Sequence, residues 1–166
     1  MRTATLTAIA TFALDQISKL AVVQGLNLIE RGVIEVVPPV LVFRMAWNQG
    51  INFGLLANDA DLVRWSLIAV SLAISAWVWV WVRRENPGRW AQISAGLLVG
   101  GAMGNVIDRV IYGAVADFLN MSCCGIENPY AFNVADIAIF AGAAGLVLFP
   151  GGGKDKTPRK PRRKTP

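Results

Sequence analysis

The sequence predicts an integral membrane α-helical protein, with four transmembrane helices and a small β-sheet between the first and second helices. Of its 166 residues, 54% are hydrophobic and only 16% are charged, which is unlike an ordinary soluble domain. The hydrophobic residues are gathered in runs close to the length of roughly 20 residues that a helix needs to cross the hydrocarbon. The basic residues gather at one set of predicted helix ends, and this indicates a fixed orientation in the membrane.

Four apolar segments are the candidate membrane helices. Residues 65–82 and 91–107 contain no charged residue, so they predict the second and third helices. Residues 4–23 and 130–149 are also apolar, but Asp15 and Lys19 interrupt the first and Asp136 interrupts the second. A charge inside a membrane is costly, so each of these residues is expected to be paired or functional.

The distribution of basic residues predicts that both chain ends are cytoplasmic. Eleven of the sixteen Lys and Arg residues lie on one side of a four-helix topology: Arg2, Arg83, Arg84, Arg89, Lys154, Lys156, Arg159, Lys160, Arg162, Arg163 and Lys164. The residues after 150 form a basic tail that we expect to be disordered and to touch anionic lipid rather than nucleic acid. The N-terminal apolar segment lacks an Ala-x-Ala-like cleavage site, so we expect it to remain as the first membrane helix.

The outward segment of about residues 24–62 has the composition of a small sheet. Val33–Val37 and Val40–Trp47 are rich in β-branched and aromatic residues, and Pro38 and Pro39 predict a turn between them. Residues 1–150 are therefore expected to form one membrane domain that carries this β segment, and residues 151–166 to form the tail.

Two groups of polar residues are spaced to share helical faces. Asp15 and Lys19 are four residues apart, and Asn105, Asp108 and Arg109 are three and four apart. Neutralisation within each group, Asp15 with Lys19 and Asp108 with Arg109, would make these charges tolerable in the membrane. On spacing alone they are predicted to be structural.

Asp117 and Asp136 differ because no basic residue lies near either of them in the sequence. Asn133 is placed as the N-cap of the fourth helix with Asp136 in its first turn, which would explain Asp136 by itself. It does not explain Asp117. If the two carboxyl groups meet, repulsion keeps one of them protonated, as an aspartic catalytic dyad requires. The helix dipole favours Asp136 as the ionised member.

Other chemistries have less support. The chain has no histidine, which excludes Ser-His-Asp and Cys-His catalysis and a His-ligated zinc. A Ser-Lys hydrolase would need Lys19, the only lysine before the tail, but the adjacent Ser18 points to another helical face, and Ser122 could reach it only through the fold. Cys123 and Cys124 are adjacent and predict no disulfide framework.

A small proton-coupled transporter remains the alternative function, whereas a lipid-binding structural protein would leave both aspartates unexplained.

Five segments of the chain, in order, resemble bacterial lipoprotein signal peptidase, also called signal peptidase II. They are residues 15–19 (DQISK), 48–54 (NQGINFG), 100–109 (GGAMGNVIDR), 115–118 (VADF) and 132–136 (FNVAD). Together they extend over most of the chain.

The resemblance implies an aspartic endopeptidase of the bacterial inner membrane, with four helices and a periplasmic β-cradle. It would cleave diacylglyceryl-modified prolipoproteins N-terminal to the lipidated cysteine, near the periplasmic face, and would be blocked by the antibiotic globomycin. Its partners would be these substrates and membrane lipids, with no nucleic acid, metal or cofactor, and it would act as a monomer. The resemblance places the catalytic dyad at Asp117 and Asp136. It assigns substrate-binding or supporting roles to Asn48, Asn105, Arg109, Asn133, Asp15, Lys19 and Asp108.

Overall fold

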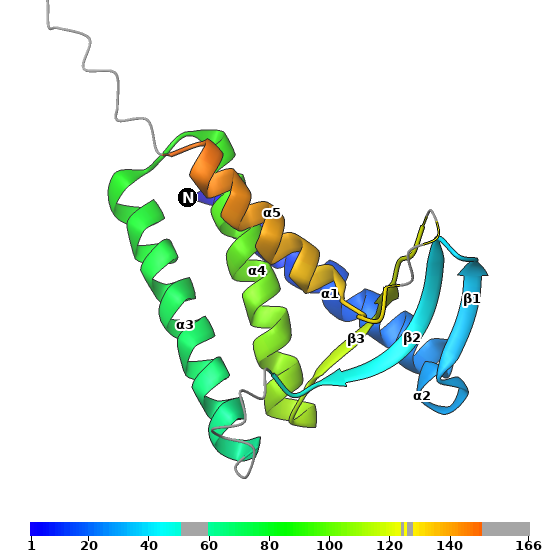
Figure 1. The fold of residues 1–166 in the computed structure, drawn as a ribbon. Helices are drawn as coiled ribbons and strands as arrows, with labels where there is room; N and C mark the ends of the chain where they lie inside the picture. The colour runs from blue at the N-terminus through cyan, green and yellow to red at the C-terminus, as the bar shows by residue number, and fades with distance from the viewer. Residues whose placement is uncertain (51–59, 124, 126–127, 151–166) are drawn as a thin grey trace, which may run out of the picture.

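The computed structural model describes residues 1–50, 60–123, 125 and 128–150. Five α-helices, one π-helix and three strands occur there. In chain order they are α1 (Arg2–Lys19), η1 (Leu20–Gly25), α2 (Leu28–Arg31), β1 (Val33–Val37), β2 (Leu41–Asn48), α3 (Ala60–Glu85), α4 (Arg89–Tyr112), β3 (Val115–Asn120) and α5 (Val134–Leu148). The long helices form a bundle, and the sheet with α2 lies beyond the end of α1 (Figure 1). The predicted basic tail, residues 151–166, lies outside the described residues.

Helix α4 is the centre of the bundle and packs against α1, α3 and α5. Glycines allow the close approach. A Cβ atom on Gly100 would lie 2.5 Å from the carbonyl oxygen of Ala8 in α1, and one on Gly101 would lie 2.5 Å from that of Ala135 in α5. A side chain at either position would thus collide with the backbone of the neighbouring helix, so these glycines set the close packing of α1 and α5 on α4.

In the part of the chain that the structure describes, three helical segments are long and apolar enough to cross a membrane. They are Arg2–Gly25, Asp61–Glu85 and Arg89–Tyr112, whereas α5 has only 15 residues. The predicted fourth segment, residues 130–149, included five residues that are not helical, because the helix begins only after the cap at Asn133 and ends at Leu148. The helical membrane fold is therefore confirmed in its coarse form, while the count of four crossings is not.

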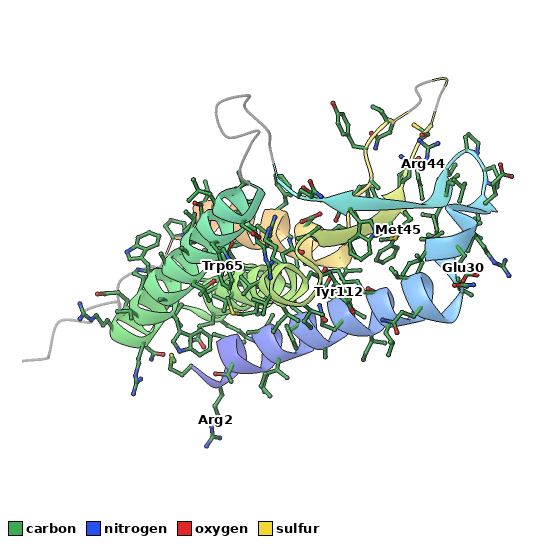
Figure 2. The ribbon with its side chains drawn as sticks, turned by 90° about the horizontal axis from the view of Figure 1, so that it is seen from below. Arg2, Glu30, Arg44, Met45, Trp65 and Tyr112 are labelled. Carbon is green, nitrogen blue, oxygen red and sulfur yellow. The ribbon has the colours of Figure 1, made fainter. Side chains whose placement is uncertain are left out.

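The two ends of the bundle are distinct. The N-terminal amino group of Met1 donates to Gln92 at 2.7 Å, and the ring of Trp90 stacks on Phe149 with centroids 6.0 Å apart. The start of α1, the start of α4 and the end of α5 therefore lie together. Arg2 lies at this end, far from Glu30 and Arg44 at the sheet end (Figure 2).

The sheet is antiparallel, in the order β1-β2-β3. The predicted strands 33–37 and 40–47 are confirmed within a residue. The third strand was not predicted, because the sequence analysis placed the whole sheet between the first two helices. It follows α4 and pairs with β2 so that Asp117 lies opposite Ala46 and Ala116 opposite Trp47.

Successive side chains of β3 point to opposite faces of the sheet. Ala116 and Phe118 are buried in a small core with Val23 and Leu28, and Phe43 meets Phe118 edge-on at 6.0 Å. Asp117, between them, points to the other face. Packing of η1 and α2 against one face of the sheet thus turns Asp117 toward the start of α5.

Candidate active site

Asp117 is held on β3 by two amide side chains from distant parts of the chain. The residue is only 2% exposed. Its Oδ2 accepts a hydrogen bond from Nδ2 of Asn48 at 3.0 Å, and its Oδ1 accepts one from Nδ2 of Asn133 at 2.6 Å. Asn48 comes from the paired strand β2, and Asn133 is the N-cap of α5. Both donors fix the orientation of the carboxyl group.

Asp136 is held in the first turn of α5 by a capping box. Oδ1 of Asn133 accepts the backbone N–H of Asp136 at 2.9 Å, and Oδ2 of Asp136 accepts the backbone N–H of Asn133 at 3.2 Å. The capping arrangement predicted from the sequence is confirmed. The other oxygen, Oδ1, accepts from Nδ2 of Asn105 in α4 at 2.9 Å.

One fully buried side chain, that of Asn133, joins the two aspartates. Its amide donates to Asp117 and to Asn105, and its carbonyl accepts from the backbone of Asp136. We call Asn48, Asn105, Asp117, Asn133 and Asp136 the dyad cluster. It contains two carboxyl groups and three amides, and no basic side chain forms a salt bridge with either carboxylate in the described residues.

Burial raises the pKa of Asp117 to about 6, and repulsion from Asp136 adds to this shift. The hydrogen bonds from Asn48 and Asn133 and the charge of Lys19 act in the opposite direction, but they are weaker. Because desolvation penalises the charged form, the carboxyl group of Asp117 keeps a proton more readily than that of a solvent-exposed aspartate.

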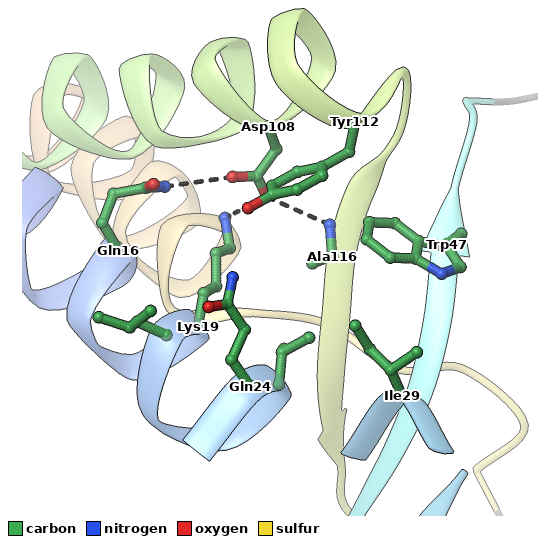
Figure 3. A pocket seen from close by; sticks show the side chains of 10 residues that line it. Gln16, Lys19, Gln24, Ile29, Trp47, Asp108, Tyr112 and Ala116 are labelled. Atoms are coloured by element: carbon green, nitrogen blue, oxygen red, sulfur yellow. Dashed lines mark hydrogen bonds and ion pairs between the residues drawn. The ribbon is translucent and has the colours of Figure 1, made fainter. Parts of the chain in front are cut away.

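A second polar group lies deeper in the bundle and is fully paired. Nζ of Lys19 lies 2.8 Å from Asp15 Oδ2 and 2.7 Å from Asp108 Oδ2. Gln16 donates to both carboxylates, at 3.0 Å and 3.2 Å. Figure 3 shows Gln16, Lys19 and Asp108 together, with the backbone of Ala116 beside them. We call Asp15, Gln16, Lys19 and Asp108 the lysine cluster.

The lysine cluster positions the backbone next to each member of the dyad. Asp108 Oδ2 accepts the N–H of Ala116 at 3.2 Å, and Asp15 Oδ1 accepts the N–H of Ala135 at 3.0 Å. Ala116 directly precedes Asp117, and Ala135 directly precedes Asp136. Lys19 also lies 3.5 Å from Oδ1 of Asn105, within the dyad cluster. The paired charges thus fix where the two unpaired carboxyl groups lie.

The expected pairing of Asp108 with Arg109 is wrong. Asp108 pairs with Lys19, which the sequence places 89 positions away, because successive helical residues diverge by about 100° and Asp108 faces α1. Arg109 instead donates within its own helix, from Nη1 to the carbonyl of Asn105 at 3.5 Å. It interacts electrostatically with Asp136, Asp117 and, least of the three, Asp108, with which it forms no salt bridge in the described residues. Its buried Nε has no hydrogen-bond partner among the described residues.

The sequence reasoning assigned no role to Gln16 or to the backbone amides of Ala116 and Ala135. Gln16 was visible in the DQISK segment, between two residues that were assigned. The two amides carry no signal in the sequence, because only the fold brings them to a carboxylate. Residues 51–54 of the NQGINFG segment lie outside the described residues.

The geometry does not favour the alternative enzyme chemistries. The contacts of Lys19 in the described part of the chain are Asp15, Asp108 and Asn105, and Ser18 donates instead to the carbonyl of Asp15 at 2.8 Å. Within residues 1–50, 60–123, 125 and 128–150 no group of three His, Cys, Asp or Glu residues is arranged to hold a metal.

Comparisons with known proteins agree with one another. The family model described as signal peptidase (SPase) II matches residues 7–150. A lipoprotein signal peptidase of Methylorubrum extorquens is 44% identical over 89% of this chain and 84% of its own length, and one of Rhodopseudomonas palustris is 38% identical over 89% and 90%. Two solved structures described as bacterial membrane enzymes superpose with TM-scores of 0.71 and 0.73 at 25% identity, covering 99% and 89% of this chain and 96% and 92% of theirs.

Fold and comparisons together define a helical membrane protease, in which two carboxyl groups lie at the junction of bundle and sheet. The chain belongs to the signal peptidase II family. The resemblance found in the sequence and the expectation of a protease are confirmed. The transporter alternative has no support from any of the comparisons.

Proposed function

We propose that the chain is an aspartic endopeptidase that removes the signal peptide from diacylglyceryl-modified prolipoproteins, N-terminal to the lipidated cysteine. The observation that carries the proposal is the bridging of Asp117 and Asp136 by the buried amide of Asn133. Proteins of the signal peptidase II family named lipoprotein signal peptidase support the choice of substrate. The geometry of the two aspartates supports the catalytic roles that we assign to them.

Asp136 is the ionised member that activates water. It lies at the helix N-terminus, accepts hydrogen bonds from Asn133 and Asn105, and is less buried than Asp117. A water molecule bound between the two carboxyl groups would lose a proton to Asp136 while its oxygen attacks the scissile carbonyl.

Asp117 is the protonated member. Its raised pKa of about 6 keeps a proton available to the carbonyl oxygen as negative charge develops there. Collapse of the tetrahedral intermediate breaks the C–N bond, and the leaving amine takes the proton that Asp136 received. The acid proton returns to Asp117 as the new carboxyl group forms, so the dyad ends with the one proton it began with.

Arg109 is suited to hold the substrate backbone. Its guanidinium lies within the field of both carboxylates but forms no salt bridge in the described residues, and its buried Nε donor is unused. A peptide carbonyl would satisfy that donor, and an unsatisfied buried donor is costly.

The distribution of basic residues and the two ends of the bundle support a membrane orientation with both termini cytoplasmic. Arg2, the basic turn between α3 and α4, and the end of α5 lie together at the end away from the dyad cluster. With that end cytoplasmic, α5 makes a short fourth crossing and the dyad cluster lies near the periplasmic face of the inner membrane. An exported precursor presents its cleavage site there, with its apolar signal helix beside the bundle.

The test is cleavage of a diacylglyceryl-modified prolipoprotein by the purified protein in detergent. We expect a product that begins at the lipidated cysteine, no cleavage of the unlipidated precursor, and inhibition by globomycin. Asp117→Asn and Asp136→Asn should each abolish cleavage, whereas Asp61→Asn, an exposed aspartate outside the site, should not. Cleavage by folded Asp117→Asn or Asp136→Asn would refute the dyad, and failure of the folded wild type on a verified substrate would refute the peptidase.

A further inference from the structure

A pocket lies on the face of the sheet that turns away from the dyad cluster. Trp47 and Ala116 line it, and these residues are the sequence neighbours of Asn48 and Asp117. Because side chains alternate along a strand, the pocket and the dyad occupy opposite faces of the same two strands. Its volume is ≈ 230 Å³, and α1, η1, α2 and the end of α4 supply the remaining walls.

The pocket carries unused hydrogen-bond donors but no unpaired cation. The side chains of Gln24, Trp47 and Tyr112 form no hydrogen bond within the described part of the chain, and Figure 3 shows all three among the residues that line the pocket. The charged residues of the lining are Lys19 and Asp108, which pair at 2.7 Å, and Lys19 also pairs with Asp15 behind the lining. Such a lining offers no free cation to an anionic ligand and suits a polar ligand whose own charges cancel.

A separate apolar trough lies along the same seam between α1 and α4, on the side of the pocket that is nearer the start of α1. Its volume is ≈ 370 Å³, and its lining is almost entirely apolar: Ala8, Ile9, Phe12, Val99, Gly100, Met103 and Ile107. On α1, Ile9 and Phe12 of the trough and Gln16 and Leu20 of the pocket follow one another at helical spacing. From Ile9 to Leu20 the helix rises about 16 Å, close to the ~15 Å depth of one bilayer leaflet.

The position of the seam matches a lipid in the outer leaflet. Trp47 and Tyr112, whose rings are 5.6 Å apart, lie at the end of the bundle where α1 and α4 meet the sheet. Aromatic side chains with a polar edge prefer the membrane interface. Leu20 beside the pocket and Ile9 beside the trough are exposed on the helix surface, where acyl chains would touch them.

We propose that this seam binds one zwitterionic glycerophospholipid, with its headgroup in the pocket and one acyl chain in the trough. Gln24 and Tyr112 donate to the phosphodiester oxygens, and the ammonium group lies against the rings of Trp47 and Tyr112. Because the one lysine of the lining is already paired with two carboxylates, the pocket favours a zwitterionic headgroup over an anionic one. The lipid is a resident of the membrane rather than the substrate, because the sheet and the lysine cluster separate the seam from Asp117.

The test is native mass spectrometry of the purified, delipidated full-length protein, titrated with phosphatidylethanolamine or phosphatidylglycerol of the same acyl composition. We expect one phosphatidylethanolamine to bind in preference to phosphatidylglycerol. Loss of two hydrogen-bond donors in Gln24→Leu/Tyr112→Phe should weaken binding about tenfold. Ile9→Trp should weaken it similarly by filling the trough.

Matched variants make the test specific. Tyr130→Phe removes an exposed phenol elsewhere, and Leu14→Trp adds an indole to the lipid-facing surface of α1 outside the trough; both should bind lipid within about twofold of wild type. Circular dichroism should show each variant folded. The proposal is overturned if no one-to-one adduct forms, if the matched variants lose as much binding, or if phosphatidylglycerol binds better. Displacement of the bound lipid by a diacylglyceryl peptide would assign the seam to the substrate instead.

Discussion

The dyad cluster and the lysine cluster each contain two buried or half-buried aspartates, yet their surroundings differ in one respect. In the lysine cluster, the ammonium of Lys19 lies within 2.8 Å of both carboxylates. In the dyad cluster, amides take the place of the cation. A cation between two carboxylates allows both of them to ionise, and the resulting ion pairs fix the local structure. Neutral amide donors do not cancel the repulsion between two carboxylates, so that repulsion keeps one of the two carboxyl groups protonated. Aspartate is thus expected to stabilise the structure in the lysine cluster and to carry out acid–base chemistry in the dyad cluster.

The lysine cluster also holds the backbone next to each aspartate of the dyad cluster. Asp108 binds the amide before Asp117, and Asp15 binds the amide before Asp136. We therefore expect changes in the lysine cluster to act mainly on stability and changes in the dyad cluster mainly on the rate of cleavage.

The largest expected effect concerns the dyad as a unit. Asp117→Asn and Asp136→Asn should each lower kcat by more than about 10³-fold, and the double variant should be little worse than either single one, since one proton-transfer unit is lost in each case. Single-turnover cleavage of the lipidated precursor measures this. Losses that multiply in the double variant would show that the two carboxyl groups act independently.

The next effect is on stability. Lys19→Met removes the cation and leaves Asp15 and Asp108 buried together, which should cost about 3–5 kcal/mol of unfolding free energy. Thermal unfolding in detergent measures it. Adding Asp108→Asn to Lys19→Met should recover part of the loss by removing one uncompensated charge; no recovery would contradict the assignment of Lys19 as the neutralising group.

A smaller effect separates capping from catalysis at Asn133. Asn133→Ser keeps an N-cap oxygen for α5, so stability should change by less than about 1 kcal/mol. It removes the amide that donates to Asp117, so kcat should fall by more than tenfold, roughly the factor expected when a charge-assisted hydrogen bond is lost. Asn128→Ser, outside the site, serves as control. Unchanged kcat would mean that Asn133 acts only as a cap.

The smallest expected effect is a dependence of stability on pH. The pKa of Asp117 rises from 3.8 to about 6 on folding, so between these values the folded state binds more protons than the unfolded state. The contribution of Asp117 to stability is therefore largest below pH 4 and is lost as the pH rises through about 6. The unfolding free energy of wild type, minus that of Asp117→Asn, should fall over this window. A difference that rises instead would place the proton on another group.

Much of this arrangement follows from the sequence, and the remainder depends on tertiary contacts. Helical spacing predicted Asp15 beside Lys19, and the capping pattern predicted Asn133 with Asp136, because both interactions are local. The partnership of Asp108 with Lys19, the strand that carries Asp117 and the late start of α5 were not predicted. Each depends on which helix face turns inward or on pairing between segments distant in sequence.

The measurement that tests the central contrast most directly compares Asp117→Asn with Asp108→Asn, reading cleavage rate and thermal unfolding on the same preparations. Asp117→Asn should abolish cleavage while retaining a folded protein of near wild-type stability at neutral pH. Asp108→Asn should lower the unfolding temperature clearly, because Lys19 and the amide of Ala116 lose a charged partner, and should keep measurable cleavage below that temperature. If the two variants show the same balance of lost activity and lost stability, the division between a catalytic and a supporting carboxyl pair is wrong.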